Sequence, residues 1–133
     1  MNKLTDLIKK ARFVFVCGNG GSAATAEHLA NDLFSKGIRA ICLNSNTSIM
    51  TMIGNDFGYE FTFSRQLTVY ATKADLLITI SCSGTSPNVV MAQKVAKNMG
   101  MEVYNFETFH KDRDYEALED KHLQVVHKIK RLI

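Results

Sequence analysis

The segment 75–98 constrains the fold of this chain more than any other, because it predicts a strand, a short polar loop and a helix in succession. Residues 75–81 are apolar and rich in β-branched side chains, as in a strand that is buried on both faces. Residues 81–88 are polar, and their one proline, Pro87, suits the first turn of a helix. Gly100 is placed to end that helix. The segment is therefore typical of one strand–helix unit of a layered α/β fold.

The loop of this unit carries hydroxyl groups at Ser81, Ser83, Thr85 and Ser86. The free N–H groups of a helix N-terminus attract anions, and the hydroxyl groups add further hydrogen-bond donors. The loop holds no lysine or arginine, so the pattern favours a phosphate group that is held by hydrogen bonds. The alternative is an ordinary strand-to-helix turn whose serines cap the helix.

The rest of the chain repeats the alternation of strands and helices. Apolar runs predict strands over 12–17, 38–43, 75–81 and 101–106. Helical patterns cover 4–11, 23–34, 48–53, 59–70, 89–98 and 118–133, with an irregular polar stretch over 107–114. This order predicts an α/β fold: a doubly wound parallel sheet with helices on both faces. Ligands of such sheets lie beyond the carboxyl ends of the strands, where the loops 18–22 and 81–86 would meet.

The length and composition predict one domain that covers residues 1–133. The net charge of +3 is mild, and the basic residues cluster only at Lys128, Lys130 and Arg131, which is typical of a solvated helix face. We therefore expect no nucleic-acid partner. We also expect no membrane partner, since no apolar run approaches the roughly 18 residues of a membrane span and the N-terminus lacks a signal-peptide pattern. An odd number of cysteines within apolar runs favours the cytoplasm.

The glycine-rich loop permits a second interpretation. Residues 18–23 fit the G-x-G-x-x-A pattern of dinucleotide-binding proteins. That pattern requires an acidic residue about 20 positions further on, where the second strand ends, to hold the ribose. Residues 43–45 are Leu, Asn and Ser, so this acid is missing. The sequence therefore disfavours a dinucleotide.

Four segments in order carry a resemblance to a known family: FVCGNGGSAATAEH (15–28), TSIMTMIGNDFG (47–58), FSRQ (63–66) and ISCSGTSPNV (80–89). Together they resemble the sugar isomerase (SIS) domain and, more narrowly, the phosphoheptose isomerases. The resemblance implies a three-layer αβα, flavodoxin-like sandwich with four to five strands. It also implies an aldose–ketose isomerase that converts sedoheptulose 7-phosphate to D-glycero-D-manno-heptose 7-phosphate, a precursor for lipopolysaccharide or capsule.

The resemblance further implies a set of substrate-binding positions. The phosphate would be held by Ser22 and by the loop 81–86, which we call the serine loop, whereas Asn19 and Asp56 would contact sugar hydroxyls. Cys82 stands where the family has a threonine, so one hydroxyl is lost and a backbone N–H remains. The substrate-binding residues expected on this basis are Asn19, Gly20, Ser22, Asp56, Ser81, Cys82, Ser83 and Ser86.

Four further residues match the positions that hold a metal, usually zinc, in this family: His28, Asp32, Glu119 and His127. His28 and Asp32 are four residues apart, so they share one helix face. By resemblance Asp32 would be the general base and His127 its partner. Considered without the resemblance, His28 suits an ordinary surface or core histidine, and His127 borders an apolar stripe.

Two of these four positions depart from the family. Asp32 stands where the family has a glutamate, which draws the carboxylate back by about 1.5 Å, and a misplacement near 1 Å can cost roughly a hundredfold in rate. Glu119 stands where the family has a glutamine, which adds a negative charge that could tighten the binding of a metal.

Two hypotheses for the function stay open at this point. The first is a sugar-phosphate isomerase with zinc or another divalent metal, assembled as a homo-oligomer, a tetramer or dimer. The second is a non-catalytic SIS module that binds a sugar phosphate or a partner protein, as the DnaA-initiator-associating type does. The retained set of metal-competent side chains favours the enzyme. A short N-terminal helical region and the charged segment 107–116 depart from the family and leave the assembly open.

Overall fold

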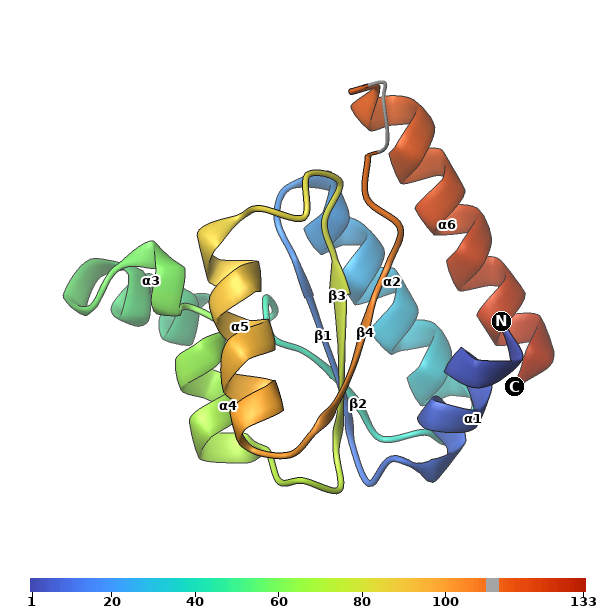
Figure 1. Ribbon diagram of the computed structural model, residues 1–133, viewed down its shortest axis with the longest axis horizontal. Helices are drawn as coiled ribbons and strands as arrows, with labels where there is room; N and C mark the ends of the chain where they lie inside the picture. Colours follow the sequence, from blue (N-terminus) through green and yellow to red (C-terminus); the bar gives the residue numbers. More distant parts are fainter. Residues whose placement is uncertain (110–112) are drawn as a thin grey trace.

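The computed structural model describes residues 1–109 and 113–133. These residues form six α-helices, one 3-10 helix and four strands (Figure 1). In chain order the elements are α1 (Asn2–Lys10), β1 (Val14–Gly18), α2 (Gly21–Ser35), β2 (Ala40–Cys42), α3 (Thr47–Asp56), η1 (Tyr59–Phe61), α4 (Ser64–Tyr70), β3 (Leu76–Ile80), α5 (Pro87–Asn98), β4 (Glu102–Asn105) and α6 (Tyr115–Leu132).

The four strands form one parallel sheet in the order β2-β1-β3-β4. Every residue of β1 and of β3 is buried, so the apolar runs of the sequence become the two central strands. The register pairs Gly18 with Ile80, so β1 and β3 end side by side and deliver their polar loops to the same edge. The predicted parallel α/β sheet is confirmed, with four strands in the described part of the chain.

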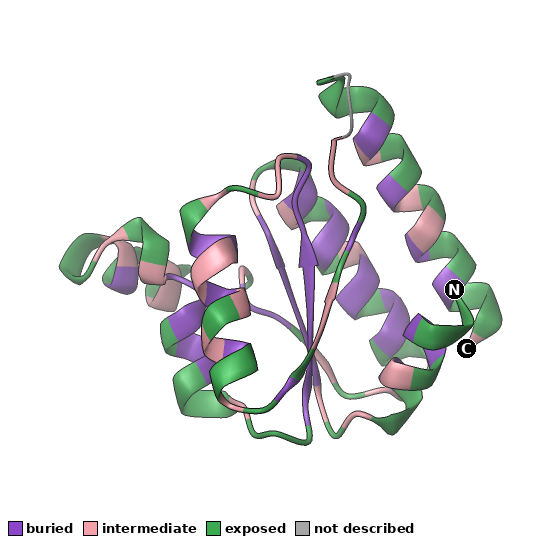
Figure 2. Ribbon diagram, viewed as in Figure 1, coloured by how far each residue is buried: buried purple, intermediate pink, exposed green. Residues whose placement is uncertain are grey.

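Helices cover both faces of the sheet, which makes three layers (Figure 1). On one face, apolar residues of α1, α2 and α6 pack against alternate residues of β1 and β3, such as Val16 and Ile78. On the other face, α4 and α5 pack against the residues in between, such as Phe15 and Leu77. Figure 2 shows this pattern as buried central strands, β1 and β3, with helices that are buried on their inner sides and exposed on their outer sides. The sandwich predicted from the sequence is confirmed.

Most predicted boundaries shift by one to three residues in the structure, and two of the differences have a clear local cause. Residues 59–70 were expected to form one helix, but the chain forms η1 and α4 with a break between them. The Thr62 hydroxyl donates a hydrogen bond to the Tyr59 carbonyl, and the Ser64 hydroxyl lies 3.5 Å from the Phe61 carbonyl. These local bonds compete with the helical ladder and end the first turn, which helical periodicity alone does not reveal.

The last helix also begins earlier than predicted, at Tyr115 and not at 118. The side chain of Asp114 accepts a hydrogen bond from the Ala117 N–H and so caps the helix at this point. The predicted irregular stretch 107–114 lies partly outside the described residues, because 110–112 are not among them.

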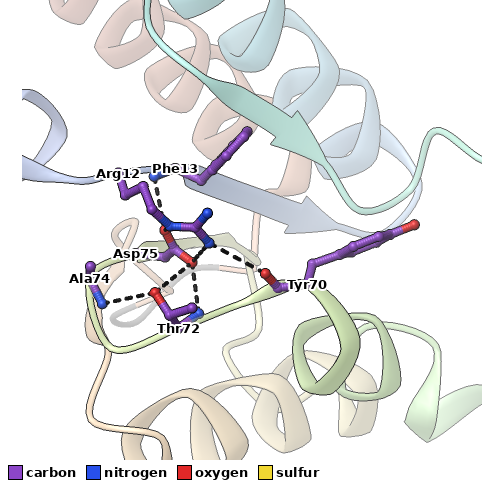
Figure 3. Close-up of polar contacts among 6 residues, drawn as sticks. All are labelled: Arg12, Phe13, Tyr70, Thr72, Ala74 and Asp75. Atoms are coloured by element: carbon purple, nitrogen blue, oxygen red, sulfur yellow. Dashed lines mark hydrogen bonds and ion pairs between the residues drawn. The ribbon is translucent and has the colours of Figure 1, made fainter.

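At the edge of the sheet opposite the polar loops, one buried carboxylate joins the starts of β1 and β3 (Figure 3). Asp75 is 2% exposed, and Arg12 donates to both of its oxygens, at 3.0 and 2.8 Å. The N–H groups of Phe13 and Thr72 donate to it at 2.9 and 2.7 Å. Burial raises the pKa of Asp75, but the hydrogen bonds from Arg12, Thr72 and Phe13 and the charge of Arg12 outweigh burial, so the pKa lies below its usual value.

Candidate active site

A polar cavity of about 120 Å³ lies where β1 and β3 end. The loops after these strands supply most of its wall, and the first turns of α6 supply the rest. The residues that line it are Asn19, Ser22, Ser81, Cys82, Ser83, Ser86, Tyr115 and Glu119. Six of the eight residues expected to bind substrate thus line one cavity, which makes it the candidate phosphate site. We call this cavity the serine pocket.

The shape of the serine loop is set by its own hydrogen bonds. The Ser81 hydroxyl accepts a hydrogen bond from the Gly84 N–H at 3.1 Å, and the Ser83 hydroxyl accepts one from the Thr85 N–H at 3.2 Å. Gly84 has a φ of +70°, a conformation that favours glycine. Ser86 is the N-cap residue of α5, as expected, but its side chain makes no capping hydrogen bond. Its hydroxyl is therefore not used to cap the helix.

Glu119 faces the same cavity from α6. The carboxylate lies so close to Gly21 that a Cβ atom there would clash with it, so the first turn of α2 has room for Glu119 because position 21 is glycine. Burial raises the pKa of the Cys82 thiol, a hydrogen bond with Ser22 lowers it in part, and the charge of Glu119 raises it. Cys82 is thus a neutral thiol at neutral pH and a poor nucleophile.

A second cluster lies further along the same two helices. Asp32, on α2, is 2% exposed, and its Oδ1 atom lies 3.2 Å from Nζ of Lys130 on α6. Its Oδ2 atom lies 3.4 Å from Nε2 of His28 and has no hydrogen-bond partner among the described residues. The rings of His28 and His127 pack edge to face, with 5.3 Å between their centroids. We call Asp32, His28, His127 and Lys130 the α2–α6 cluster.

The two sites are linked because α2 and α6 lie side by side and begin at the same edge of the sheet (Figure 1). Glu119 lies beside Gly21, and Lys130 lies beside Asp32. At about 1.5 Å of rise per residue, His28 lies roughly 9 Å and Asp32 roughly 15 Å along α2 from Ser22. The serine pocket and the α2–α6 cluster therefore both lie along the contact between α2 and α6, the first at its start and the second further along.

The predicted four-residue metal set is divided between these two places. Glu119 lies in the serine pocket, whereas His28, Asp32 and His127 lie in the α2–α6 cluster. Eight residues separate Glu119 from His127, which is about 12 Å along a helix axis. In residues 1–109 and 113–133, no three His, Cys, Asp or Glu side chains form a group that could hold a metal ion. As arranged in this chain, the four side chains do not fit a single metal site.

Of the remaining predicted site residues, Asn19 lines the pocket, whereas Gly20 and Asp56 do not. The Asn19 amide exchanges hydrogen bonds with Asn88, at 2.8 and 2.9 Å, and Tyr59 donates to it at 3.2 Å. Gly20 caps α2 with a φ of +57°. Asp56 is exposed at the end of α3, where it accepts a hydrogen bond from Asn55, and it is not part of the pocket wall.

Two residues of these sites were missed in the sequence. Tyr115 lines the pocket, and it could have been found only if the start of α6 had been placed correctly. Lys130 was assigned to a solvated helix face, yet its ammonium group contacts a buried carboxylate. Its spacing of three from His127 places both on one face of a helix, which was the available signal.

The chain matches one family of known proteins. The family model described as SIS domain matches residues 1–107. The chain belongs to the SIS domain family. Among curated SIS relatives, the phosphoheptose isomerase of Campylobacter concisus is 44% identical over 106 residues, which cover 75% of this chain and 56% of that protein. That of Helicobacter pylori is 47% identical over 95 residues, which cover 67% and 50%. The chain thus spans about half the length of the curated relatives it matches.

Solved structures agree with the SIS assignment. The phosphoheptose isomerase of Neisseria gonorrhoeae matches with a TM-score of 0.91 at 28% identity, over 98% of this chain and 80% of that one. The phosphoheptose isomerase of Francisella tularensis matches with a TM-score of 0.87 at 22% identity, over 98% and 82%, and so supports the fold. None of the described helices is both long enough and apolar enough to cross a membrane.

Proposed function

We propose that this SIS domain binds a sugar phosphate in the serine pocket and isomerises it at the α2–α6 cluster, with sedoheptulose 7-phosphate as the substrate. The relatives named phosphoheptose isomerase support the reaction class. One observation carries the proposal: a hydroxyl-lined pocket and a buried carboxylate with an unused oxygen both lie along the contact between α2 and α6.

The spacing of the two sites suits a long open-chain sugar phosphate. Carbon–carbon bonds of about 1.5 Å place C2 of an extended heptose 7-phosphate roughly 9 Å from its phosphorus. That length reaches from the first turn of α2 to His28, about 9 Å along the helix, and Oδ2 of Asp32 lies 3.4 Å from Nε2 of His28. With the phosphate among the loop hydroxyls, the two reacting carbons would come to the α2–α6 cluster.

The reaction moves one proton between neighbouring carbons. In the proposed sequence, Oδ2 of Asp32 removes a proton from C1 of the ketose while His127 gives a proton to the oxygen on C2, which forms an enediol. His127 then takes the proton from the oxygen on C1, and Asp32 returns its proton to C2, which forms the aldose. Each group ends in its starting state, as general acid–base catalysis requires. Because Asp32 is 2% exposed, the half-exposed His28 side chain next to Oδ2 has to move for substrate to enter.

The zinc implied by the resemblance to phosphoheptose isomerases has no assembled site in the described residues. His28, Asp32 and His127 would have to rearrange before all three could bind one ion. Lys130 would also have to leave Asp32. The proposed reaction therefore uses side chains of this chain alone.

The remaining parts of the proposal concern the whole molecule. We propose that residues 1–133 act as one SIS domain in the cytoplasm, because the three cysteines Cys17, Cys42 and Cys82 are free and buried, as in a reducing compartment. We also propose a homo-oligomer, a tetramer or dimer, because Val69 is 80% and Phe34 is 74% exposed, and large exposed apolar side chains mark contact surfaces.

The test is conversion of sedoheptulose 7-phosphate by the purified chain and by His127→Ala. The wild type is expected to convert the substrate, and the variant to lose roughly a hundredfold or more in turnover. Lys128→Ala, the exposed neighbour on α6, is the matched control and is expected to keep its turnover. Binding of the sugar phosphate without any conversion would replace the proposal with the non-catalytic SIS module.

A further inference from the structure

We propose that Lys130 is the resident cation of the α2–α6 cluster: it holds the charge of Asp32 in the role that a divalent metal would otherwise take. This inference rests on the proposed function, because it assigns the cluster to the reaction. It makes the chain an isomerase that works without zinc.

The first support is the burial of the charge that Lys130 meets. Asp32 is 2% exposed, and a buried carboxylate is strongly unfavourable unless a cation or several hydrogen bonds compensate it. Asp32 has few other partners: Oδ2 accepts no hydrogen bond from the described residues, and His28 lies 3.4 Å away. Lys130, at 3.2 Å from Oδ1, is therefore the main compensating charge.

The second support is that the two carboxylate oxygens of Asp32 have different contacts. Lys130 contacts Oδ1, which leaves the lone pairs of Oδ2 unused on the side of His28. This arrangement stabilises a carboxylate without blocking the oxygen that would take the proton. Lys130 is thus a positioning residue that acts through Asp32.

The third support is electrostatic exclusion of a metal. A zinc ion bound to Oδ2 at about 2.0–2.2 Å would lie within roughly 8 Å of the Lys130 ammonium group. The repulsion between a doubly and a singly charged ion at that distance weakens metal binding about sixfold, even with the screening of water. In the buried surroundings of Asp32 the effect is larger. The lysine and a metal therefore compete for one carboxylate.

Zinc binding, measured by calorimetry, separates these alternatives without any need for turnover. The wild-type chain, purified without chelator, is expected to hold well under one zinc per chain and to keep its turnover in a chelator. Lys130→Met, which keeps the aliphatic stem and removes the charge, is expected to bind zinc at least roughly sixfold more tightly. Lys130→Arg keeps a cation and is expected to behave like the wild type.

Lys128→Met is the matched control, since it removes the same charge from an exposed position two residues away. It is expected to leave zinc affinity unchanged. One zinc per wild-type chain with chelator-sensitive turnover would overturn the inference, as would equal zinc affinity of Lys130→Met and Lys128→Met. If Lys130→Met does not fold, the zinc content of the wild type and of Lys130→Arg decides. A wild type that neither converts the sugar nor holds zinc refutes the proposed function and leaves the zinc result intact.

Discussion

Two aspartates of this chain are equally buried and differently partnered. Asp75 and Asp32 are each 2% exposed, and each contacts one cationic side chain, Arg12 or Lys130. Asp75 also accepts hydrogen bonds from two backbone N–H groups, and both of its oxygens are bonded. Asp32 has one oxygen paired and one without a hydrogen bond.

The difference separates a structural carboxylate, Asp75, from Asp32, the carboxylate that we propose to be reactive. The hydrogen bonds of Asp75 join the starts of β1 and β3 and hold its charge in place, at the edge of the sheet opposite the serine pocket (Figure 3). Asp32 lies on the helix that leads away from the pocket, with an unused oxygen. Fully bonded buried groups stabilise a fold, whereas a partly bonded group keeps lone pairs for chemistry.

The largest effect is expected when Asp32 is replaced. Asp32→Asn keeps the shape of the side chain and removes the proton acceptor, so turnover of sedoheptulose 7-phosphate should fall roughly a thousandfold. The free energy of unfolding, measured in urea, should change by less than about 1 kcal/mol, because the half-exposed Lys130 can turn to water. Full turnover of this variant would show that Asp32 takes no part in the reaction and would contradict its contrast with Asp75.

Replacement of Asp75 should reverse this pattern. Asp75→Ala leaves Arg12 and two backbone N–H groups without their acceptor, so the free energy of unfolding should fall by about 3 kcal/mol. Turnover per folded molecule should stay within about twofold, a range of well under 1 kcal/mol. Arg12→Met is the matched control and should cost less, because the N–H groups still bind the carboxylate. A loss of turnover without a loss of stability would contradict the structural role.

The serine pocket should show a smaller effect on binding. Ser83→Ala combined with Ser86→Ala removes two hydroxyl groups from the pocket wall, so affinity for the sugar phosphate should fall roughly thirtyfold, or about 2 kcal/mol. Thr85→Val is the control, because Thr85 is exposed and does not line the pocket. Calorimetry measures both, and unchanged affinity of the double variant would exclude the loop as the phosphate site.

Acid should weaken the fold partly through Asp75. Since its pKa in the folded chain lies below the usual value, its contribution is fully present above the pKa of the unfolded chain, near 3.9, and is lost as the pH falls through the folded pKa. The loss should be smaller than that in Asp75→Ala, because the protonated acid keeps part of its hydrogen bonding. The measurement is urea unfolding of the wild type and Asp75→Asn between pH 6 and 3, a window around the pKa of the unfolded chain. The free energy of unfolding should fall less steeply with decreasing pH in the variant. Parallel slopes would refute this assignment.

The smallest effect is expected at Glu119. Its carboxylate lies in the cavity assigned to a phosphate, so Glu119→Gln should tighten the binding of inorganic phosphate by about threefold. Asp120→Asn, on the exposed side of α6, is the control and should change little. Weaker binding in Glu119→Gln would show that Glu119 holds the ligand and does not repel it.

Much of the architecture was predictable from local patterns. The apolar runs that became β1 and β3 are buried on both faces, so they appear in the sequence without alternation, and the loops after them carry glycine and serine. Parallel strands necessarily bring such loops to one edge. For this reason the sequence alone predicts that six of the proposed substrate-binding residues lie near one another, as they do in the pocket.

Helical spacing predicted less about the second site. It placed Glu119 and His127 on nearby faces of one helix, but it did not indicate where along α2 each of them would make contact. The structure puts Glu119 beside Gly21 and leaves His127 near His28, so the expected metal set is divided. Periodicity identifies a face, whereas the packing of α6 on α2 decides which residues share a contact.

The sequence by itself determined the layered α/β fold, the parallel sheet and the polar loops at its carboxyl edge, because these follow from hydrophobic period and turn chemistry over short distances. The tertiary structure alone decided which charges meet. Lys130 pairs with Asp32 across 98 residues, and Arg12 pairs with Asp75 across 63, since the energy of a charge pair depends on distance and burial in space and not on separation along the chain.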